Sequence, residues 1–201
     1  MDDHEPRPGG EGVPSGRTDD LVAWAAAESA ALLSGLGDRW LQVQGVVAKA
    51  RWVGETFERD DGEHLVAAAH LHAVGYAPEL HVTGLHQLDG ARHIRAHGHE
   101  RLACLVAHHT ESRFELGMRG YAGHLDAYPS ERSEVSAALI YCVMTTGPTG
   151  APMAFADRVA DVYRRHGPET LIAEALRRAM PDLALAMAGI TMRLRRFGRV
   201  A

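Results

Sequence analysis

Apolar residues recur every three or four positions along most of this chain, which is the spacing of one face of an α-helix. The clearest run has its apolar positions at Trp40, Val43, Val46, Val47, Ala50 and Val53. Glycine and proline interrupt the pattern between such runs, most firmly in the segment Gly-Pro-Thr-Gly at residues 147–150. No segment shows the strict alternation of a half-buried strand. The periodicity therefore predicts an all-α fold, a bundle of about ten helices.

The composition agrees with helices and limits the classes of function. The chain is 46% hydrophobic but only 6% aromatic, so strand-favouring aromatic residues are sparse. A net charge of −5 argues against nonspecific nucleic-acid binding through a basic face. The sequence contains neither an apolar stretch of membrane-spanning length nor a secretion signal. We therefore expect a cytoplasmic protein, bacterial by its Ala- and Arg-rich composition, that binds neither nucleic acid nor membrane.

The organisation along the chain indicates one helical domain after a short leader. Residues 1–18 are rich in glycine, proline and charge, and we expect them to be disordered. Residues 19–150 should form the main bundle, and residues 151–201 should add helices that pack on the same domain. The expected helices span approximately 21–32, 38–53, 63–73, 86–97, 100–109, 113–127, 134–145, 154–166, 168–179 and 181–197. The apolar residues of 171–194 either close the core or form a homodimer contact.

The chain has 13 histidines, and most of them need no functional explanation. A single histidine on an amphipathic helix is usually a solvated or structural residue. We expect that role for His4, His64, His81, His93, His97, His99, His124 and His166. His70 and His72 are two positions apart on a helix, so at most one of them should face a shared interior site. Neutral imidazoles that converge from separate helices build metal or acid–base centres.

Five blocks of sequence carry a resemblance to a known family. They read RWLQV at 39–43, LVAAAHLHAVGYAP at 65–78, TGLHQLDGA at 83–91, LVAHH at 105–109 and YCVMTTGP at 141–148. Together they resemble the HD superfamily, helical proteins that hold one or two metal ions and usually hydrolyse phosphate esters. The resemblance covers about residues 38–150 and implies an HD-type helical bundle, followed here by a C-terminal helical extension.

Three of the four ligands that the resemblance implies for the first metal ion are replaced in this chain. Gln42 stands where relatives carry a histidine, Ala73 replaces the aspartate that follows His72, and Val143 replaces the last aspartate. Carboxylates neutralise the charge of a divalent ion as well as donating lone pairs to it. Because two carboxylates are lost, we expect no tight metal site and no other cofactor.

Two alternatives remain open at this point. In relatives with two metal ions, residues matching His86, His108 and His109 bind the second ion, and three imidazoles can hold zinc. A residual metal-dependent hydrolase that uses these three histidines is therefore one alternative. The other is a non-catalytic binding or regulatory protein, because the turns at 75–78 and 146–148 would persist for folding alone.

We favour a metal-independent pocket that acts on a small organic molecule by acid–base chemistry, as a lyase, isomerase or cyclase does. Buried imidazoles have lowered pKa values and can serve as general bases. The expected catalytic residues are His72, His86, His108 and His109. The expected substrate-binding residues are Gln42, Tyr76, Asp89 and Arg113. Within this set, Gln42 should orient an oxygen of the substrate and Asp89 should fix the tautomer of an imidazole.

Overall fold

The computed structural model describes residues 18–199, and every regular element within that range is helical. The α-helices are α1 (Thr18–Leu33), α2 (Asp38–Gly54), α3 (Arg59–Leu71), α4 (His86–Ala96), α5 (Glu100–His108), α6 (Arg113–Met118), α7 (Ala122–Leu125), α8 (Glu134–Met144), α9 (Phe155–His166) and α10 (Leu171–Arg196). The 3-10 helices are η1 (Val74–Tyr76), η2 (Pro78–Leu80) and η3 (His109–Glu111). The described range holds no strand, only an isolated bridge between Thr146 and Pro152. The all-α prediction is confirmed, while the predicted leader lies outside the described residues except for residue 18, which begins α1.

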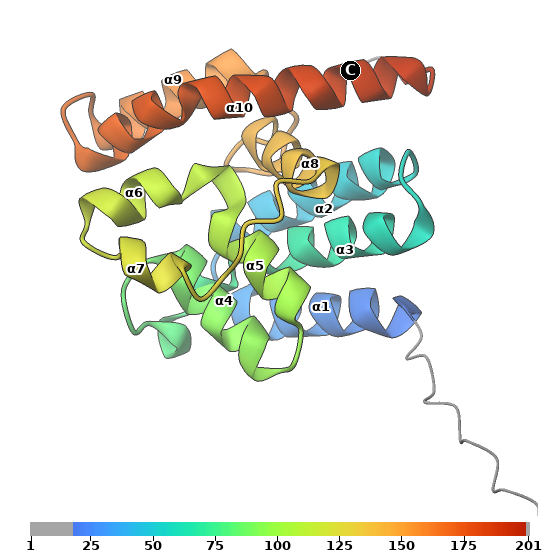
Figure 1. Ribbon diagram of the computed structural model, residues 1–201, viewed down its shortest axis with the longest axis horizontal. Coiled ribbons are helices and arrows are strands. Elements are labelled where there is room, and N and C mark those ends of the chain that lie inside the picture. The colour runs from blue at the N-terminus through green and yellow to red at the C-terminus, as the bar shows by residue number, and fades with distance from the viewer. Residues whose placement is uncertain (1–17, 200–201) are drawn as a thin grey trace, which may run out of the picture.

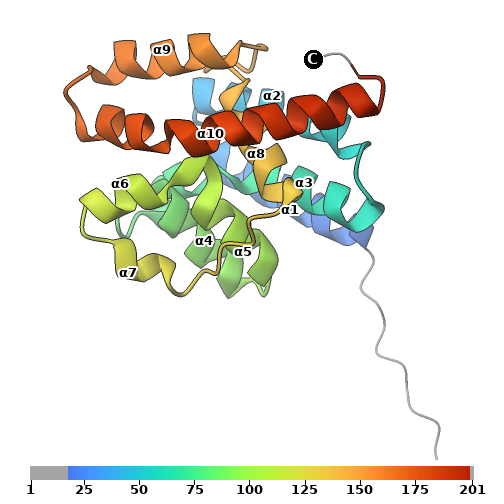
Figure 2. The ribbon, with the colours of Figure 1, turned by 45° about the horizontal axis from the view of Figure 1, so that its top comes forward.

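The helices are stacked in layers, as Figure 1 shows. The first helix, α1, lies at one edge of the molecule and packs on α3, which also packs on α2. The last helix, α10, lies across the opposite edge with α9 beside it. Figure 2 shows this α9–α10 pair from another side, with α10 against α6 and α8. The C-terminal helices therefore close the bundle that the first eight helices build.

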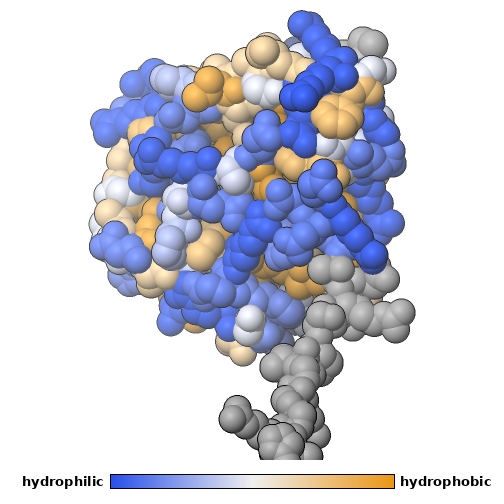
Figure 3. Space-filling view, turned by 45° about the vertical axis from the view of Figure 1, so that its right-hand side comes forward, coloured by the Kyte–Doolittle hydropathy of each residue, from blue (hydrophilic) through white to orange (hydrophobic). Residues whose placement is uncertain are grey.

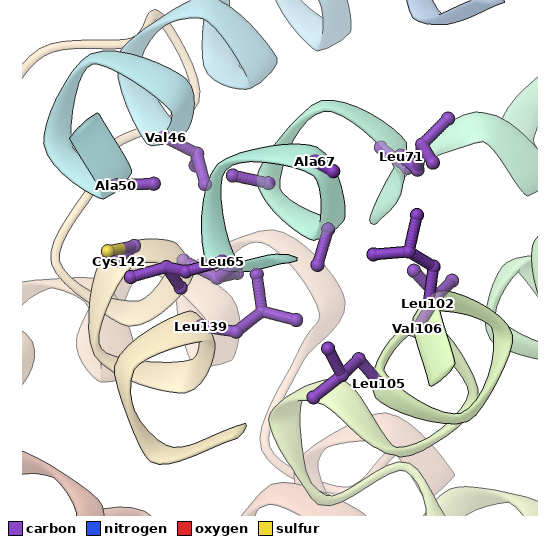
Figure 4. Close-up of a cluster of buried hydrophobic side chains, with 14 of the residues drawn as sticks. Val46, Ala50, Leu65, Ala67, Leu71, Leu102, Leu105, Val106, Leu139 and Cys142 are labelled. Carbon is purple, nitrogen blue, oxygen red and sulfur yellow. The ribbon is translucent and has the colours of Figure 1, made fainter. Parts of the chain in front are cut away.

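The core is centred on α3, in which every residue from Leu65 to Leu71 is buried. In Figure 4 the side chains of α3 lie between those of α2, such as Val46, and those of α8, such as Leu139. A helix surrounded on several sides needs consecutive apolar or small residues rather than one apolar stripe. Cys142 lies in the same cluster, and both Cys142 and Cys104 are buried free thiols.

Two of the predicted helix boundaries were wrong. The single helix expected at 113–127 is two short helices, α6 and α7, because Gly120 has a φ of 82° and turns the chain between them. The break expected at Pro181 is absent, because α10 continues through it. Proline removes one backbone hydrogen bond from a helix. Two residues after Pro181, Leu183 is fully buried in a cluster with Ile140 of α8, and this packing offsets the lost hydrogen bond.

The surface is mixed in character. In the face shown in Figure 3, hydrophilic side chains alternate with small hydrophobic areas. None of the helices described for residues 18–199 combines the length and the apolar character needed to cross a bilayer. Leu185 and Met192, seven positions apart on α10, are 73% and 69% exposed. The homodimer contact expected on this helix stays a prediction.

Candidate functional site

A cavity of about 410 Å³ lies in the bundle, between α2, the segment that joins α3 to α4, η3, α8 and the α9–α10 pair. We call it the histidine cavity, after the imidazoles of His72, His86 and His109 in its wall. Gln42 and Val143 also line it. Gln42 and Val143, two of the three residues that replace metal ligands of the resembled family, therefore line the same cavity as His72. The third, Ala73, follows His72 in the chain and is buried.

The three imidazoles come from three separate elements and meet edge to face. His72 directly follows α3, His86 begins α4 and His109 begins η3. The ring centroid of His109 lies 5.6 Å from that of His72 and 5.4 Å from that of His86, with interplanar angles of 81° and 70°. The ring of Tyr76 stacks on His86 at a centroid distance of 4.0 Å. The rings of Tyr76, His86, His109 and His72 therefore form one continuous group within the cavity wall.

Hydrogen bonds to the backbone fix the tautomers of two of these rings. Nδ1 of His72 lies 2.8 Å from the carbonyl oxygen of Ala69, and Nδ1 of His109 lies 2.6 Å from that of Val106. A carbonyl oxygen can only accept a hydrogen bond, so in both rings Nδ1 carries the proton and donates it. In both neutral rings Nε2 is then left with a lone pair that can accept a proton.

Burial keeps all three imidazoles neutral. Burial, followed by the charge of His109, lowers the pKa of His72 to about 3 and lowers the pKa of His86 well below its usual value. Burial also lowers the pKa of His109 to about 4, against a raising effect of its bond to Val106. The guanidinium of Arg39 contributes to the lowered pKa of each ring. An anion placed in the cavity would raise these pKa values, because it favours the charged form of an imidazole.

One positive charge enters the cavity from α2. The Nη1 of Arg39 donates a hydrogen bond of 2.9 Å to Oε1 of Gln42, and its guanidinium lies 3.8 Å from the ring centroid of Tyr76. The hydrogen bond to Oε1 leaves the amide NH₂ of Gln42 free to donate to a ligand. The side-chain partners of Arg39 within residues 18–199 are thus a neutral amide and an aromatic ring, and no carboxylate of that range pairs with its charge.

A second group of positive charge comes from α9. Arg158 and Arg165 line the cavity and share the carboxylate of Asp161, at 3.0 Å and 2.7 Å. Arg158 is buried, and its Nε has no hydrogen-bond partner among the described residues. Burial and then the charge of Arg165 lower its pKa. A buried donor without a partner costs free energy of about 1–3 kcal/mol, and a ligand that accepts its hydrogen bond would recover that cost.

The acidic residues of the cavity do not balance these cations. Glu111 and Glu115 line the cavity, but each is paired with an arginine. Glu111 lies 2.8 Å from Arg113, and Glu115 lies 2.9 Å from Arg119. The excess of arginine at the wall makes the cavity attractive to an anion.

The role predicted for Asp89 is corrected by its contacts. Its carboxylate accepts hydrogen bonds from the backbone N–H groups of Val82, Thr83 and Gly84, at 2.9–3.2 Å, and from the Thr83 hydroxyl. Asp89 is buried and does not line the cavity. It therefore holds the loop before α4 in place instead of fixing the tautomer of an imidazole.

Two further predicted site residues lie outside the cavity. Nε2 of His108 donates a hydrogen bond of 2.5 Å to the carbonyl oxygen of Tyr128. Arg113 pairs with Glu111 and, at 2.6 Å, with Asp182 of α10. Neither His108 nor Arg113 lines the cavity, so the structure gives them structural contacts in place of the catalytic and substrate-binding roles expected for them.

The donor set of the cavity does not fit the metal ion that the resemblance implies. The side chains at hand are neutral imidazoles and the Gln42 amide, beside the charge of Arg39 and without a free carboxylate among the lining residues described. A divalent ion placed there would have no negative charge to neutralise it. The alternative set of His86, His108 and His109 does not converge, since His108 is bound to the Tyr128 backbone.

The arginines at 39, 158 and 165 were missed by the sequence analysis. Arg158 and Arg165 are seven positions apart, which places them two turns apart on one face of α9, with Asp161 between them. That spacing indicates a charged helix face, but nothing in it predicts that the face meets the imidazoles.

Comparisons with known protein families, with curated proteins and with solved structures found no match. The HD resemblance therefore stays a prediction.

Proposed function

We propose that the histidine cavity binds a small organic anion and transfers a proton on it without a metal ion. The observation that supports this proposal is that one cavity contains both proton-accepting imidazoles and positively charged arginines. The neutral imidazoles of His72 and His109, each with a lone pair on Nε2, line the same cavity as the arginines at 39, 158 and 165. Imidazoles accept protons and arginines bind carboxylate or phosphate groups, so the pair suits acid–base chemistry on an anion.

Each residue has a distinct task in this proposal. Arg158 and Arg39 hold the anionic group, and the buried Nε–H of Arg158 gains the partner that it lacks. The NH₂ of Gln42 donates to a second oxygen of the ligand. The Nε2 of His109 or His72 takes a proton from a carbon of the substrate. In an isomerisation the imidazolium returns this proton to another carbon, and in an elimination it gives the proton to the departing group as the double bond forms, so neither reaction needs an oxidant.

The low pKa values of the imidazoles make the bound anion part of the mechanism. A base with a pKa of about 4 is weak at neutral pH. A carboxylate or phosphate close to the ring favours the imidazolium and raises that pKa toward neutrality. Proton transfer is thereby coupled to the presence of the substrate.

The test combines ligand binding with proton exchange. Small carboxylates and phosphate esters are screened for an increase in melting temperature, and each ligand found is incubated with the protein in D₂O and followed by NMR. Arg158→Gln should abolish the thermal shift. At least one of the variants His109→Gln and His72→Gln should keep the shift and lose the exchange of substrate hydrogen, and exchange that survives in both would overturn the proposal. His124→Gln, at an exposed position, should change neither the shift nor the exchange. Binding unaffected by Arg158→Gln would overturn the proposal, and so would activity lost on treatment with EDTA while the melting temperature stays unchanged.

A non-catalytic binding protein is the second candidate, and the same low pKa values favour it. If no substrate raises the pKa of His109, the cavity binds an anion and moves no proton. Ligand binding that depends on Arg158, without exchange in D₂O for any ligand of the screen, would select this function over the first.

A further inference from the structure

A second group of potential ligands lies on α1 and α4, away from the histidine cavity. Glu28 is on α1, His93 is on α4, and His97 caps the C-terminal end of α4. One carboxylate oxygen of Glu28 and one ring nitrogen of each histidine all lie within 4.8 Å of one another. Within residues 18–199, no other set of three His, Cys, Asp or Glu residues meets that distance. None of the three lines the histidine cavity.

This group contains an ion pair and a third potential ligand beside it. Oε1 of Glu28 lies 2.7 Å from Nε2 of His93, with both side chains partly buried. His97 follows one helical turn later on the same face of α4, and its ring centroid lies 4.5 Å from that of His93. The ring of His97 also lies 5.7 Å from that of Trp24, so Glu28, His93 and His97 meet where α1 approaches the end of α4.

The free nitrogen of His97 is the one that a metal would use. Its Nδ1 lies 2.9 Å from the backbone carbonyl oxygen of His93. Because the carbonyl can only accept, Nδ1 carries the proton and Nε2 keeps a lone pair. A backbone hydrogen bond to the second ring nitrogen is the usual way in which a metal-binding histidine is oriented.

We propose that Glu28, His93 and His97 bind a zinc ion that links α1 to α4. Two imidazoles and one carboxylate form a donor set that holds zinc and leaves the fourth position to water. Unlike the cavity, this group offers a carboxylate to neutralise part of the charge of the ion. The packing of α1 is mainly on α3, so the ion would add a link from α1 to α4.

The experiment is zinc titration of the full chain, purified without an affinity tag and stripped with chelator. Calorimetry should give one ion per chain, and Co²⁺ should give the absorption bands of a tetrahedral site. Zinc should also raise the melting temperature, because it binds only the folded arrangement. His97→Ala and Glu28→Gln should each weaken zinc binding by more than about tenfold. His97 is exposed, so its variant should keep the parental circular dichroism spectrum.

His124→Ala, at another exposed histidine, is the matched control and should bind zinc as the parent does. The proposal is overturned if zinc fails to bind, if His97→Ala binds as the parent does, or if His124→Ala weakens binding equally. Zinc binding that survives His97→Ala and is lost in His109→Ala would place the ion in the histidine cavity. That result would overturn both this inference and the metal-independent function.

Discussion

Replacing His70 with leucine is expected to make the protein more resistant to acid. His70 lies on α3, is 5% exposed, and neither of its ring nitrogens has a hydrogen-bond partner among the described residues. Burial, and then the charge of Arg51, lowers its pKa from 6.5 to about 4. The folded chain therefore holds a neutral imidazole at a pH at which the unfolded chain binds a proton.

The size of the effect follows from this difference. Above pH 6.5 the imidazole is neutral in both states, and between 6.5 and about 4 only the unfolded chain is protonated, so the free energy of unfolding falls with the pH. Below about 4 both states bind the proton and the loss is complete. At about 1.4 kcal/mol per pH unit the total is about 3 kcal/mol, of which about 2 kcal/mol is lost above pH 5. Leucine does not titrate, so the variant should avoid this loss.

Urea denaturation at pH 7 and at pH 5 measures the difference. The parent should lose about 2 kcal/mol more between the two pH values than His70→Leu does. His124→Leu, at an exposed site, should lose as much as the parent. At pH 7 the leucine variant should be as stable as the parent or more so, because it removes two unpartnered buried nitrogens. Equal losses in parent and His70→Leu, or an NMR titration of the His70 ring near 6.5, would refute the reasoning.

Three further changes test the packing that positions the site. Gly75→Ala would place a Cβ 2.0 Å from the carbonyl oxygen of His86 and should lower the melting temperature sharply, whereas Gly117→Ala, with no atom within 4 Å, should not lower it. Asp89→Asn removes the charge that holds the loop before α4 and should cost about 1–3 kcal/mol in urea denaturation; no loss would contradict that role. Leu139→Ala, at a fully buried position, should cost about 2–5 kcal/mol by the same measurement; a loss well below that range would mean a looser core.

The helices that the sequence predicted well are those whose boundaries are set by neighbouring residues. The run from Trp40 to Val53 predicted α2, because an apolar face and a preceding glycine at 37 specify a helix locally. Pro181 misled the prediction because the contacts that carry α10 through it come from α8, about forty residues earlier in the chain. Local propensity is a weak guide where such distant packing decides the outcome.

The same distinction applies to the site. His72, His86 and His109 could be identified from sequence blocks, and all three line the cavity. His108 stands one position before His109, which turns its side chain by about 100° and toward the carbonyl oxygen of Tyr128. Asp89 lies three positions after His86, and its carboxylate binds the N–H groups of the loop at 82–84, a contact that the sequence block does not reveal. The cluster of Glu28 with His93 joins residues 65 positions apart, and no spacing in the sequence could predict it.

Arginines can perform one of the two tasks of a metal ion in a hydrolase, and this difference supports the proposed function. A metal ion in a hydrolase attracts an anionic substrate, and it also generates a nucleophilic hydroxide from water. Guanidinium groups such as those of Arg39 and Arg158 can perform the first task, because they remain charged and bind carboxylate or phosphate with directed hydrogen bonds. They cannot perform the second, because a guanidinium only donates hydrogen bonds to water and is no Lewis acid that coordinates the oxygen and lowers the pKa of the water. Under the proposed function, the arginines bind the anion and the imidazoles move the proton, while the described residues that line the cavity offer no source of hydroxide, so proton transfer suits this set of side chains better than hydrolysis.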